Sequence, residues 1–382
     1  MSSDSILIIG AGTLGTSLAY HLSQTLSDSS EVTILDRTPT PPSHAAAIDV
    51  NRIVRTDYAN KLYSSLANEA LHAWTWNLEL QRFIHKTGWL VLEEEGSKAS
   101  EDVRRVFKER GFDRSWDVEV KEVGEKWDGL KGSDLDGFGK AYFNEEAGWV
   151  EAAKATGAFM RAAKEKGVKR VVRQVEKLLW SEKNGRVEGV RLDDGGELTA
   201  EKVVLAAGAW TSSLLSPVED ALSMPEEDRI ERQAQARAVV SAYYKLSETE
   251  CQQLGQPNNM PIVVYGKQGE VIPPSKDQTL LKYNLSGSMI VNNVTTGSGH
   301  TISVPTVPER SQYDVLGRIK DEMKDALTSK LMPEYVRDKH PDYYRLCWDA
   351  CTPTEDLLMC RHPHERLSNL YIAVGGSFSG YN

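Results

Sequence analysis

The sequence has few cysteines, no excess of basic residues and no long hydrophobic run. No stretch approaches the roughly 18 apolar residues that a membrane span needs, so we expect no membrane partner. The net charge of −10 repels phosphate backbones, which argues against nucleic acid as a partner. The four cysteines form no C-x-x-C pair, and this excludes a zinc ribbon or a thioredoxin-type redox pair.

The sequence also indicates the compartment in which the protein works. The apolar stretch at residues 6–9 is too short for a secretion signal and has no basic flank. Ser329-Lys330-Leu331 matches a peroxisomal signal, but such a signal is read at the extreme C-terminus and this one is internal. Because few cysteines are typical of a reducing compartment, we expect an intracellular protein, in the cytoplasm or in peroxisomes. No acidic or thiolate partners accompany His362 and His364 at ligand spacing, so no metal site is predicted.

The length of 382 residues exceeds the roughly 250 to 300 at which one hydrophobic core stops growing, and two domains are therefore expected. The clearest local organisation lies in residues 6–36. An apolar strand runs into a glycine turn, Leu14, Leu18 and Leu22 follow at helical spacing, and a second strand ends at Asp36. This order predicts a βαβ unit.

Each glycine of that turn has a separate physical task. In a dinucleotide-binding turn Gly10 permits the tight bend, Gly12 lets the backbone approach a pyrophosphate, and Gly15 lets helix and strand pack closely. The N–H groups at the helix start face the phosphates, and Asp36 accepts the ribose hydroxyls. The pattern predicts a dinucleotide site and leaves FAD and NAD open.

Later segments favour the flavin. The strand that begins at Lys202 ends in small residues up to Trp210, and it resembles the second nucleotide-proximal strand of glutathione-reductase-type flavoproteins. Residues 88–92 read as a strand, 151–166 as a helix, and 175–180 with 187–192 as a hairpin. The acidic stretch 217–229 reads as a surface insertion, and 232–307 as the sheet of a second domain.

The ordered set of motifs resembles the amine-oxidising flavoproteins that include monomeric sarcosine oxidase, pipecolate and saccharopine oxidases, and fructosyl amino acid oxidases. The motifs span nearly the whole chain: the glycine turn, residues 51–55, the strand up to Trp210, Leu281-Lys282, the Cys347 motif and the loop from Gly375 to Gly380. The resemblance implies an α/β fold with a Rossmann-like, glutathione-reductase-type FAD-binding domain and a second α+β substrate domain on a mixed or antiparallel sheet. Residues 1–85, 145–215 and 340–382 would form the first domain, and 86–144 and 216–339 the second.

The resemblance also assigns roles to residues. A cysteine followed six residues later by proline carries the flavin through an 8α-S-cysteinyl bond, and Cys347 with Pro353 has this spacing. Lys282 falls where the family places a lysine that stabilises the charge developing on oxygen, Arg55 matches a substrate-carboxylate clamp, and Arg52 matches an arginine beside the flavin. The cofactor-binding residues that it implies are Gly10, Gly12, Thr13, Leu14, Gly15, Asp36, Arg37, Ser43, Arg52, Val175, Ala207, Gly208, Trp210, Cys347, Gly376, Ser377, Phe378 and Gly380.

In the family the last of these loops continues to a further substrate-binding lysine and a closing helix. This sequence stops at Tyr381 and Asn382, inside the loop, which leaves the completeness of its carboxylate site open.

Together these features predict a monomeric FAD-dependent oxidase of a secondary amino acid, N-substituted or cyclic, which forms an imine and reduces O2 to H2O2. A fructosyl amino acid oxidase is the first alternative, and a tailoring oxidase whose imine is trapped by an internal nucleophile is the second. From another class, an NAD-dependent dehydrogenase would share the glycine turn but would have no use for Cys347 or Lys282. An inactive flavin-binding protein also stays open.

Overall fold

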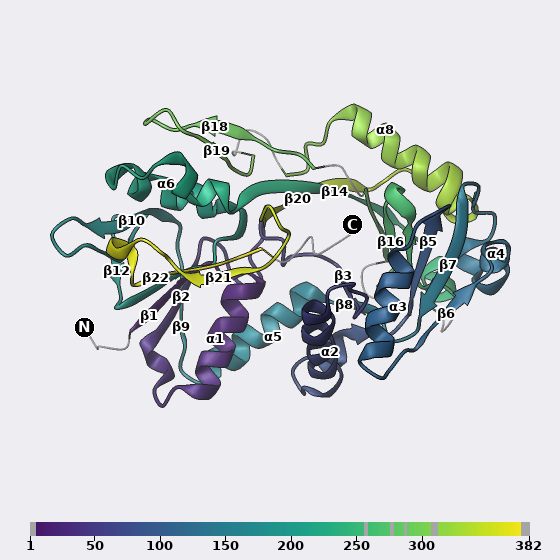
Figure 1. Ribbon diagram of the computed structural model, residues 1–382, viewed down its shortest axis with the longest axis horizontal. Helices are drawn as coiled ribbons and strands as arrows, with labels where there is room; N and C mark the ends of the chain where they lie inside the picture. Colours follow the sequence, from purple (N-terminus) through teal and green to yellow (C-terminus); the bar gives the residue numbers. More distant parts are fainter. Residues whose placement is uncertain (1–4, 256–258, 276–278, 286–288, 307–311, 376–382) are drawn as a thin grey trace.

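The computed structural model describes residues 5–255, 259–275, 279–285, 289–306 and 312–375, and Figure 1 shows them in two halves, each built around a large sheet. One half holds a six-stranded sheet in the order β21-β22-β13-β1-β2-β9, and the other an eight-stranded sheet in the order β20-β14-β17-β16-β15-β5-β7-β6. The predicted α/β class, with a Rossmann-like unit and a second unit on a mixed sheet, is confirmed.

The six-stranded sheet is centred on β1 (Ile6–Ile9), whose neighbours β13 (Lys202–Leu205) and β2 (Val32–Asp36) both run parallel to it. Both faces of this sheet are covered, which explains why its strands are continuous apolar runs rather than alternating ones. The other strands are β9 (Lys169–Val172), β22 (Leu370–Val374) and the antiparallel edge strand β21 (Leu358–Arg361).

The side chains of β1 alternate between two buried layers. Ile8 packs with α1 (Thr13–Thr25) and α5 (Ala152–Glu165) on one face, in a cluster that includes Ala19 and Met160. Leu7 and Ile9 pack on the other face, against α6 and a three-stranded sheet. That layer consists of α6 (Thr211–Ala221), β10 (Val175–Ser181), β11 (Arg186–Leu192) and β12 (Glu197–Thr199), and it includes the predicted hairpin.

The eight-stranded sheet is antiparallel except for the parallel pair β5 and β15. One face packs with α8 (Gly317–Asp325) in a large apolar cluster that includes Val240, Leu281 and Trp348. The strands are β20 (Tyr343–Cys351), β14 (Gln235–Lys245), β17 (Leu280–Asn284), β16 (Glu270–Ile272), β15 (Ile262–Tyr265), β5 (Trp89–Glu94), β7 (Phe138–Asn144) and β6 (Ser115–Val118).

A small sheet packs on the eight-stranded sheet, with Trp149 and Ile53 in one apolar cluster with Trp89, and in it β3 (Arg52–Val54) and β4 (Ile84–His85) both pair with β8 (Gly148–Val150). The domain boundaries stay a prediction. The segment 340–382, predicted to belong to the FAD-binding domain, supplies β21 and β22 to the six-stranded sheet and β20 to the edge of the eight-stranded one. The remaining elements are α2 (Lys61–Trp76), α3 (Ala99–Glu109), α4 (Val123–Lys126), α7 (Glu248–Leu254), α9 (Pro333–Val336), β18 (Asn293–Thr295) and β19 (Thr301–Ser303).

The segment 217–229 is exposed at residues 226–228, as expected of a surface insertion, but it also buries charged side chains. Glu219 and Arg229 are 0% and 3% exposed, and the Arg229 guanidinium contacts the carboxylates of both Glu219 and Asp220. The backbone N–H of Ile230 donates to Glu219 Oε1 at 2.7 Å. Composition does not reveal this pairing, and charged groups that are paired and hydrogen-bonded can be buried.

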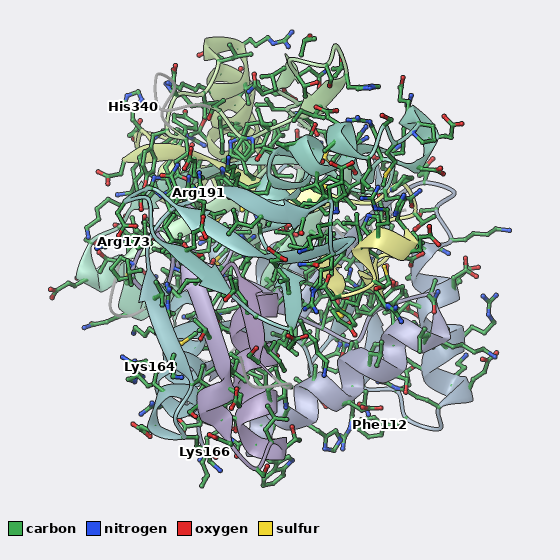
Figure 2. All side chains as sticks on the ribbon, turned by 90° about the vertical axis from the view of Figure 1, so that its left-hand side faces the viewer. Phe112, Lys164, Lys166, Arg173, Arg191 and His340 are labelled. Atoms are coloured by element: carbon green, nitrogen blue, oxygen red, sulfur yellow. The ribbon has the colours of Figure 1, made fainter. Side chains whose placement is uncertain are left out.

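Most other charged side chains lie at the surface, as Lys164 and Lys166 do in Figure 2, where both project from the end of α5. In the part of the chain that the structure describes, no helix is both long and apolar enough to cross a membrane.

Candidate active site

A cavity of about 1330 Å³ lies between the two halves, and residues from both sheets line it. Its volume exceeds the range of roughly 300 to 1,000 Å³ of ordinary small-molecule pockets, which leaves room for a dinucleotide and a substrate together. The predicted site residues that line it are Gly10, Gly12, Thr13, Leu14, Asp36, Arg37, Arg52, Arg55, Val175, Ala207, Gly208, Trp210, Lys282 and Cys347.

The other predicted residues are placed differently. Gly15 is not among the lining residues, and Ser43 lies in an exposed loop, where its hydroxyl is 2.9 Å from His44 Nδ1. Gly376, Ser377, Phe378 and Gly380 fall outside the described residues.

The three glycines of the first turn meet three different surroundings. Gly10 has φ +105°, and a Cβ there would lie 2.3 Å from the carbonyl oxygen of Ala206. A Cβ on Gly15 would lie 1.9 Å from the carbonyl oxygen of Gly10, so Gly15 allows α1 to pack against the turn. A Cβ on Gly12 would meet nothing closer than Ala45 Cβ at 4.0 Å, and Gly12 faces the cavity. Of the three glycines, only Gly12 has open space where a side chain would project.

Asp36 and Arg37 lie at the end of β2, beside this turn. Asp36 Oδ2 accepts the Ala11 N–H at 2.8 Å, so the carboxylate fixes the turn while it also faces the cavity. The Arg37 guanidinium lies 4.4 Å from the centre of the Trp210 ring, and burial lowers the pKa of Arg37. A carboxylate has about four acceptor positions, so Asp36 can still accept ribose hydroxyls.

These surroundings fit a dinucleotide. The N-terminus of α1 begins at Gly12 with no side-chain cap, so no side chain competes with a phosphate for its N–H groups. The space beside Gly12 allows close approach, and Asp36 supplies the acceptor at the expected end of β2.

Lys282 lies on the face of β17 that turns toward the cavity, and its side chain is fully buried. Its Nζ is 2.7 Å from Oδ2 of Asp49, whose other oxygen accepts the Tyr243 hydroxyl at 2.9 Å. Burial lowers the pKa of Lys282, and Asp49 opposes that effect. Burial would raise the pKa of Asp49, but Lys282 and Arg52 outweigh it and hold this pKa at about 2. Lysine and aspartate thus form a buried ion pair beside the cavity.

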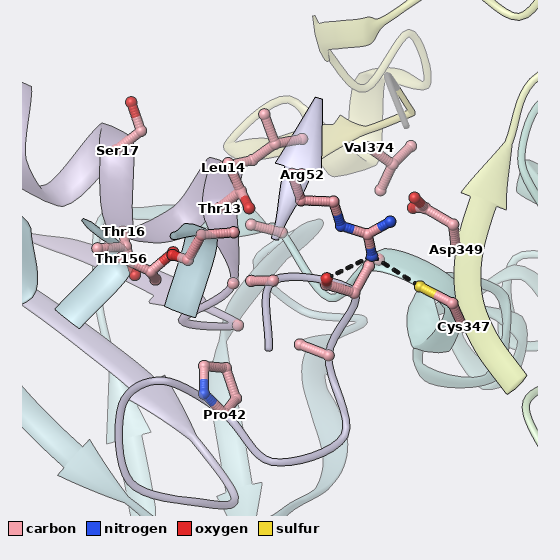
Figure 3. Close-up of a pocket in the computed structure, with 18 of the residues that line it drawn as sticks. Thr13, Leu14, Thr16, Ser17, Pro42, Arg52, Thr156, Cys347, Asp349 and Val374 are labelled. Carbon is pink, nitrogen blue, oxygen red and sulfur yellow. Dashed lines mark hydrogen bonds between the residues drawn. The ribbon is translucent and has the colours of Figure 1, made fainter. Parts of the chain in front are cut away.

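Arg52 joins this pair to Cys347, and Figure 3 shows its guanidinium beside the Cys347 sulfur. One guanidinium nitrogen, Nη2, donates to Cys347 Sγ at 2.8 Å and to the Ala46 carbonyl at 2.7 Å, and lies 3.4 Å from Asp49 Oδ2. The arginine and the cysteine are 295 positions apart in the chain. This hydrogen bond holds the Cys347 sulfur at the cavity wall, next to the Lys282–Asp49 pair.

Arg55 lies on the same side of the cavity, among aromatic rings. Its guanidinium carbon is 4.3 Å from the centre of the Tyr58 ring and 5.3 Å from that of Trp89, and one nitrogen donates to the Asp57 carbonyl. Asp57 is buried and accepts hydrogen bonds from Tyr142 and Asn144, both at 2.9 Å. The arginine is therefore held by stacking and by a fixed backbone turn.

Four polar residues of this region escaped the sequence analysis: Asp49, Tyr243, Glu270 and Asp349. Asp49 interrupts the apolar stretch 45–50, and such an isolated acid is a signal that could have been used. Asp349, two residues beyond Cys347, lines the cavity, and burial raises its pKa to about 6. Among the described residues, no group of three or more His, Cys, Asp or Glu is arranged to hold a metal ion.

Comparison with known proteins identifies the family of this chain. The family model "FAD dependent oxidoreductase" matches residues 5–382. An L-saccharopine oxidase of Schizosaccharomyces pombe is 26% identical over 98% of this chain and 86% of its own length. A monomeric sarcosine oxidase of a Bacillus species is 25% identical over 55% of this chain and 53% of its own.

Solved structures extend the similarity to the whole fold. The crystal structure of the fructosamine oxidase Amadoriase II of Aspergillus fumigatus superposes with a TM-score of 0.82 at 25% identity, over 100% of this chain and 84% of that one. This chain belongs to the family of FAD-dependent oxidoreductases.

Proposed function

We propose that the protein is an FAD-dependent oxidase of a secondary amino acid, N-substituted or cyclic. The observation that carries the proposal is the buried Lys282–Asp49 pair, linked through Arg52 to Cys347, in the cavity that also contains the dinucleotide turn. Bound FAD would take a hydride equivalent from the carbon next to the amine nitrogen, leaving an imine, and would pass the electrons to O2 to give H2O2.

Cys347 is the proposed attachment point of the flavin. It faces the cavity, and the Arg52 guanidinium donates a hydrogen bond to its sulfur, the atom that would form the covalent bond to the flavin. Cys351, on the same strand, is not among the residues that line the cavity, and burial raises the pKa of its thiol to about 12. The two cysteines of β20 therefore differ in access to the cavity and in the groups around their sulfur atoms.

Lys282 would keep a positive charge at the position where oxygen is reduced. In a buried site such a charge is worth more than in water, because little solvent screens it. Asp49 and the Tyr243 hydroxyl fix the position of the lysine nitrogen.

Arg55 would bind the substrate carboxylate. Its planar fork suits two parallel hydrogen bonds to a carboxylate, and the Tyr58 and Trp89 rings hold the guanidinium plane at the cavity wall. The adjacent aromatic surface would contact the carbon skeleton of the amino acid.

A fructosyl amino acid oxidase is the second candidate, and the Amadoriase II structure supports it because that protein covers the whole chain. A tailoring amine oxidase, an inactive flavin-binding protein and an NAD-dependent dehydrogenase complete the alternatives. We also propose that the protein acts as a monomer inside the cell, in the cytoplasm or in peroxisomes.

Anaerobic mixing of the purified protein with candidate amines tests the proposal. An N-methyl or cyclic amino acid should bleach the flavin absorbance, and admitted O2 should restore it with one H2O2 per amine consumed. Bleaching by a fructosyl amino acid alone would favour the second candidate. A protein that holds no flavin, or a flavin that no amine reduces, would contradict the proposal.

A further inference from the structure

A row of polar side chains that lines the cavity, called the polar row below, has no role in the proposed oxidation. Ser241, Asn284 and Glu270 occupy a single register row across β14, β17 and β16, because Ser241 pairs with Asn284 and Asn284 with Glu270. All three line the cavity. The next row on the same face of the sheet contains Ile272 paired with Lys282. The polar row therefore lies beside the proposed oxygen-activating lysine.

Hydrogen bonds fix the direction of this row. Ser241 Oγ donates to Asn284 Oδ1 at 2.6 Å, which leaves the Asn284 amide NH2 group to face the other way. That group donates to Glu270 Oε1 at 2.6 Å. Because Ser241 and Asn284 are buried, at 1% and 8% exposure, the row holds a carboxylate of known orientation at the cavity wall.

We propose that Glu270 selects substrates that carry a second cationic group, namely amino acids whose side chain ends in an ammonium or guanidinium. The inference rests on the proposed function and adds the substrate class. A carboxylate at a partly desolvated wall favours a cation that can hydrogen-bond to it. The nearby Lys282 is already paired with Asp49, so its charge is largely compensated within its own row.

The geometry also sets the length of such a substrate. Glu270 lies two strands from Trp89, over which Arg55 is stacked, because β15 pairs with both β16 and β5. Strands about 4.8 Å apart and a one-row offset of about 6.8 Å put these two backbone positions roughly 12 Å apart. The Glu270 side chain reaches into the cavity from one position and the Arg55 guanidinium lies over the Trp89 ring at the other, so the gap between them approaches the span of a lysine-sized amino acid.

The test compares two ligands of equal length on the FAD-loaded protein by titration calorimetry. L-lysine and L-2-aminoheptanoic acid differ in a terminal ammonium against a methyl group, and both are primary amines that serve here as probes of binding. Lysine should bind at least about tenfold more tightly. Equal affinity, or no binding of either ligand, would overturn the proposal, and this comparison needs no variant.

Two variants then test whether Glu270 causes the preference for lysine. Glu270→Gln keeps an acceptor for Asn284 and should abolish the preference for lysine. Glu176→Gln removes a carboxylate from another part of the same cavity and should leave the preference intact. A preference that survives in Glu270→Gln would contradict the assignment.

Turnover measurements distinguish a failure of this inference from a failure of the proposed function. With Nα-methyl-L-lysine, Glu270→Gln should raise KM about tenfold and leave kcat unchanged, while KM for N-methyl-L-2-aminoheptanoic acid stays the same. Oxidation of both amines with equal KM in the unmodified protein would refute the inference and leave the oxidase intact. If lysine binds but no amine is oxidised, the proposed oxidase function is refuted and the cation-binding role of Glu270 stands.

Discussion

The charge on Lys282 depends on a carboxylate that lies 233 positions earlier in the chain. Burial lowers the pKa of this lysine, and Asp49 is the group that raises it. Asp49→Asn keeps the shape but removes the negative charge. The pKa of Lys282 should then fall further, and the lysine should lose its proton at a lower pH.

The measurement is the rate at which O2 reoxidises the reduced flavin, followed against pH. In the unmodified protein the rate should fall as pH rises through the lowered pKa of Lys282, and in Asp49→Asn this fall should move to lower pH. Lys282→Met is the control and should react slowly at every pH. An unchanged midpoint in Asp49→Asn would show that the carboxylate does not govern the lysine.

The same substitution should also be visible in stability. Removing one partner of a buried ion pair leaves the other charge unpaired, at a cost of about 3 kcal/mol. The rates are therefore compared at a temperature well below the melting transition of the variant.

The sequence motifs identified some residues of the candidate site, and other site residues were missed for a physical reason. Cys347, Lys282, Arg52 and Arg55 stand in local motifs, and all four line the cavity. Asp49 and Glu270 gain their importance from partners on other strands, and a single sequence does not contain that pairing. Pairs of residues so distant in sequence become neighbours only through strand register.

Among the elements, the turn between β1 and α1 offers a matched pair of substitutions. Gly15→Ala places a Cβ 1.9 Å from the Gly10 carbonyl oxygen and should destabilise the fold by more than about 1 kcal/mol, because backbone must move. Gly12→Ala meets open space and should leave the melting temperature nearly unchanged while it weakens FAD binding. Thermal melts of the flavin-free proteins and flavin titrations separate the two effects. Equal flavin affinity in Gly12→Ala and in the unmodified protein would contradict the assignment of the phosphate site.

Helix α6 contains a titratable group of a different kind. Burial raises the pKa of Glu219 to about 7, above its ordinary value of 4.5. The folded protein thus binds this proton more tightly than the unfolded chain, so the stabilisation is complete below about pH 4.5 and is lost as pH rises to 7.

We expect the free energy of unfolding to fall over that interval with a slope of up to about 1.4 kcal/mol per pH unit from this group. In Glu219→Gln that contribution should vanish, as urea titrations at several pH values would reveal. The same slope in the variant would assign the effect to other groups.

The elements themselves were largely predictable from local pattern. The βαβ unit, the hairpin at 175–192 and the helix near 151–166 have the predicted type and order, because each depends on neighbouring residues. The buried charges of the segment 217–229 were not predictable in this way, because they are paired inside the fold, as Arg229 is with Glu219 and Asp220.

In the whole molecule, the site exists because two sheets face one cavity. The six-stranded sheet contributes the dinucleotide turn, and the eight-stranded sheet contributes Lys282 and Cys347 on its face opposite to α8. Motif order along the sequence was sufficient to predict both halves. The register of the eight-stranded sheet was not predictable, because its strands come from residues 89–94, 115–144, 235–284 and 343–351 and pair over long separations.

The most direct test of this account is the intact mass of the denatured protein, with Cys347→Ala and Cys351→Ala beside it. We predict a mass above that of the 42.5 kDa chain by one FAD, retained in Cys351→Ala and lost in Cys347→Ala. The mass of the bare chain in all three proteins, or an FAD increment that survives in Cys347→Ala, would contradict the assignment of Cys347 as the flavin attachment site.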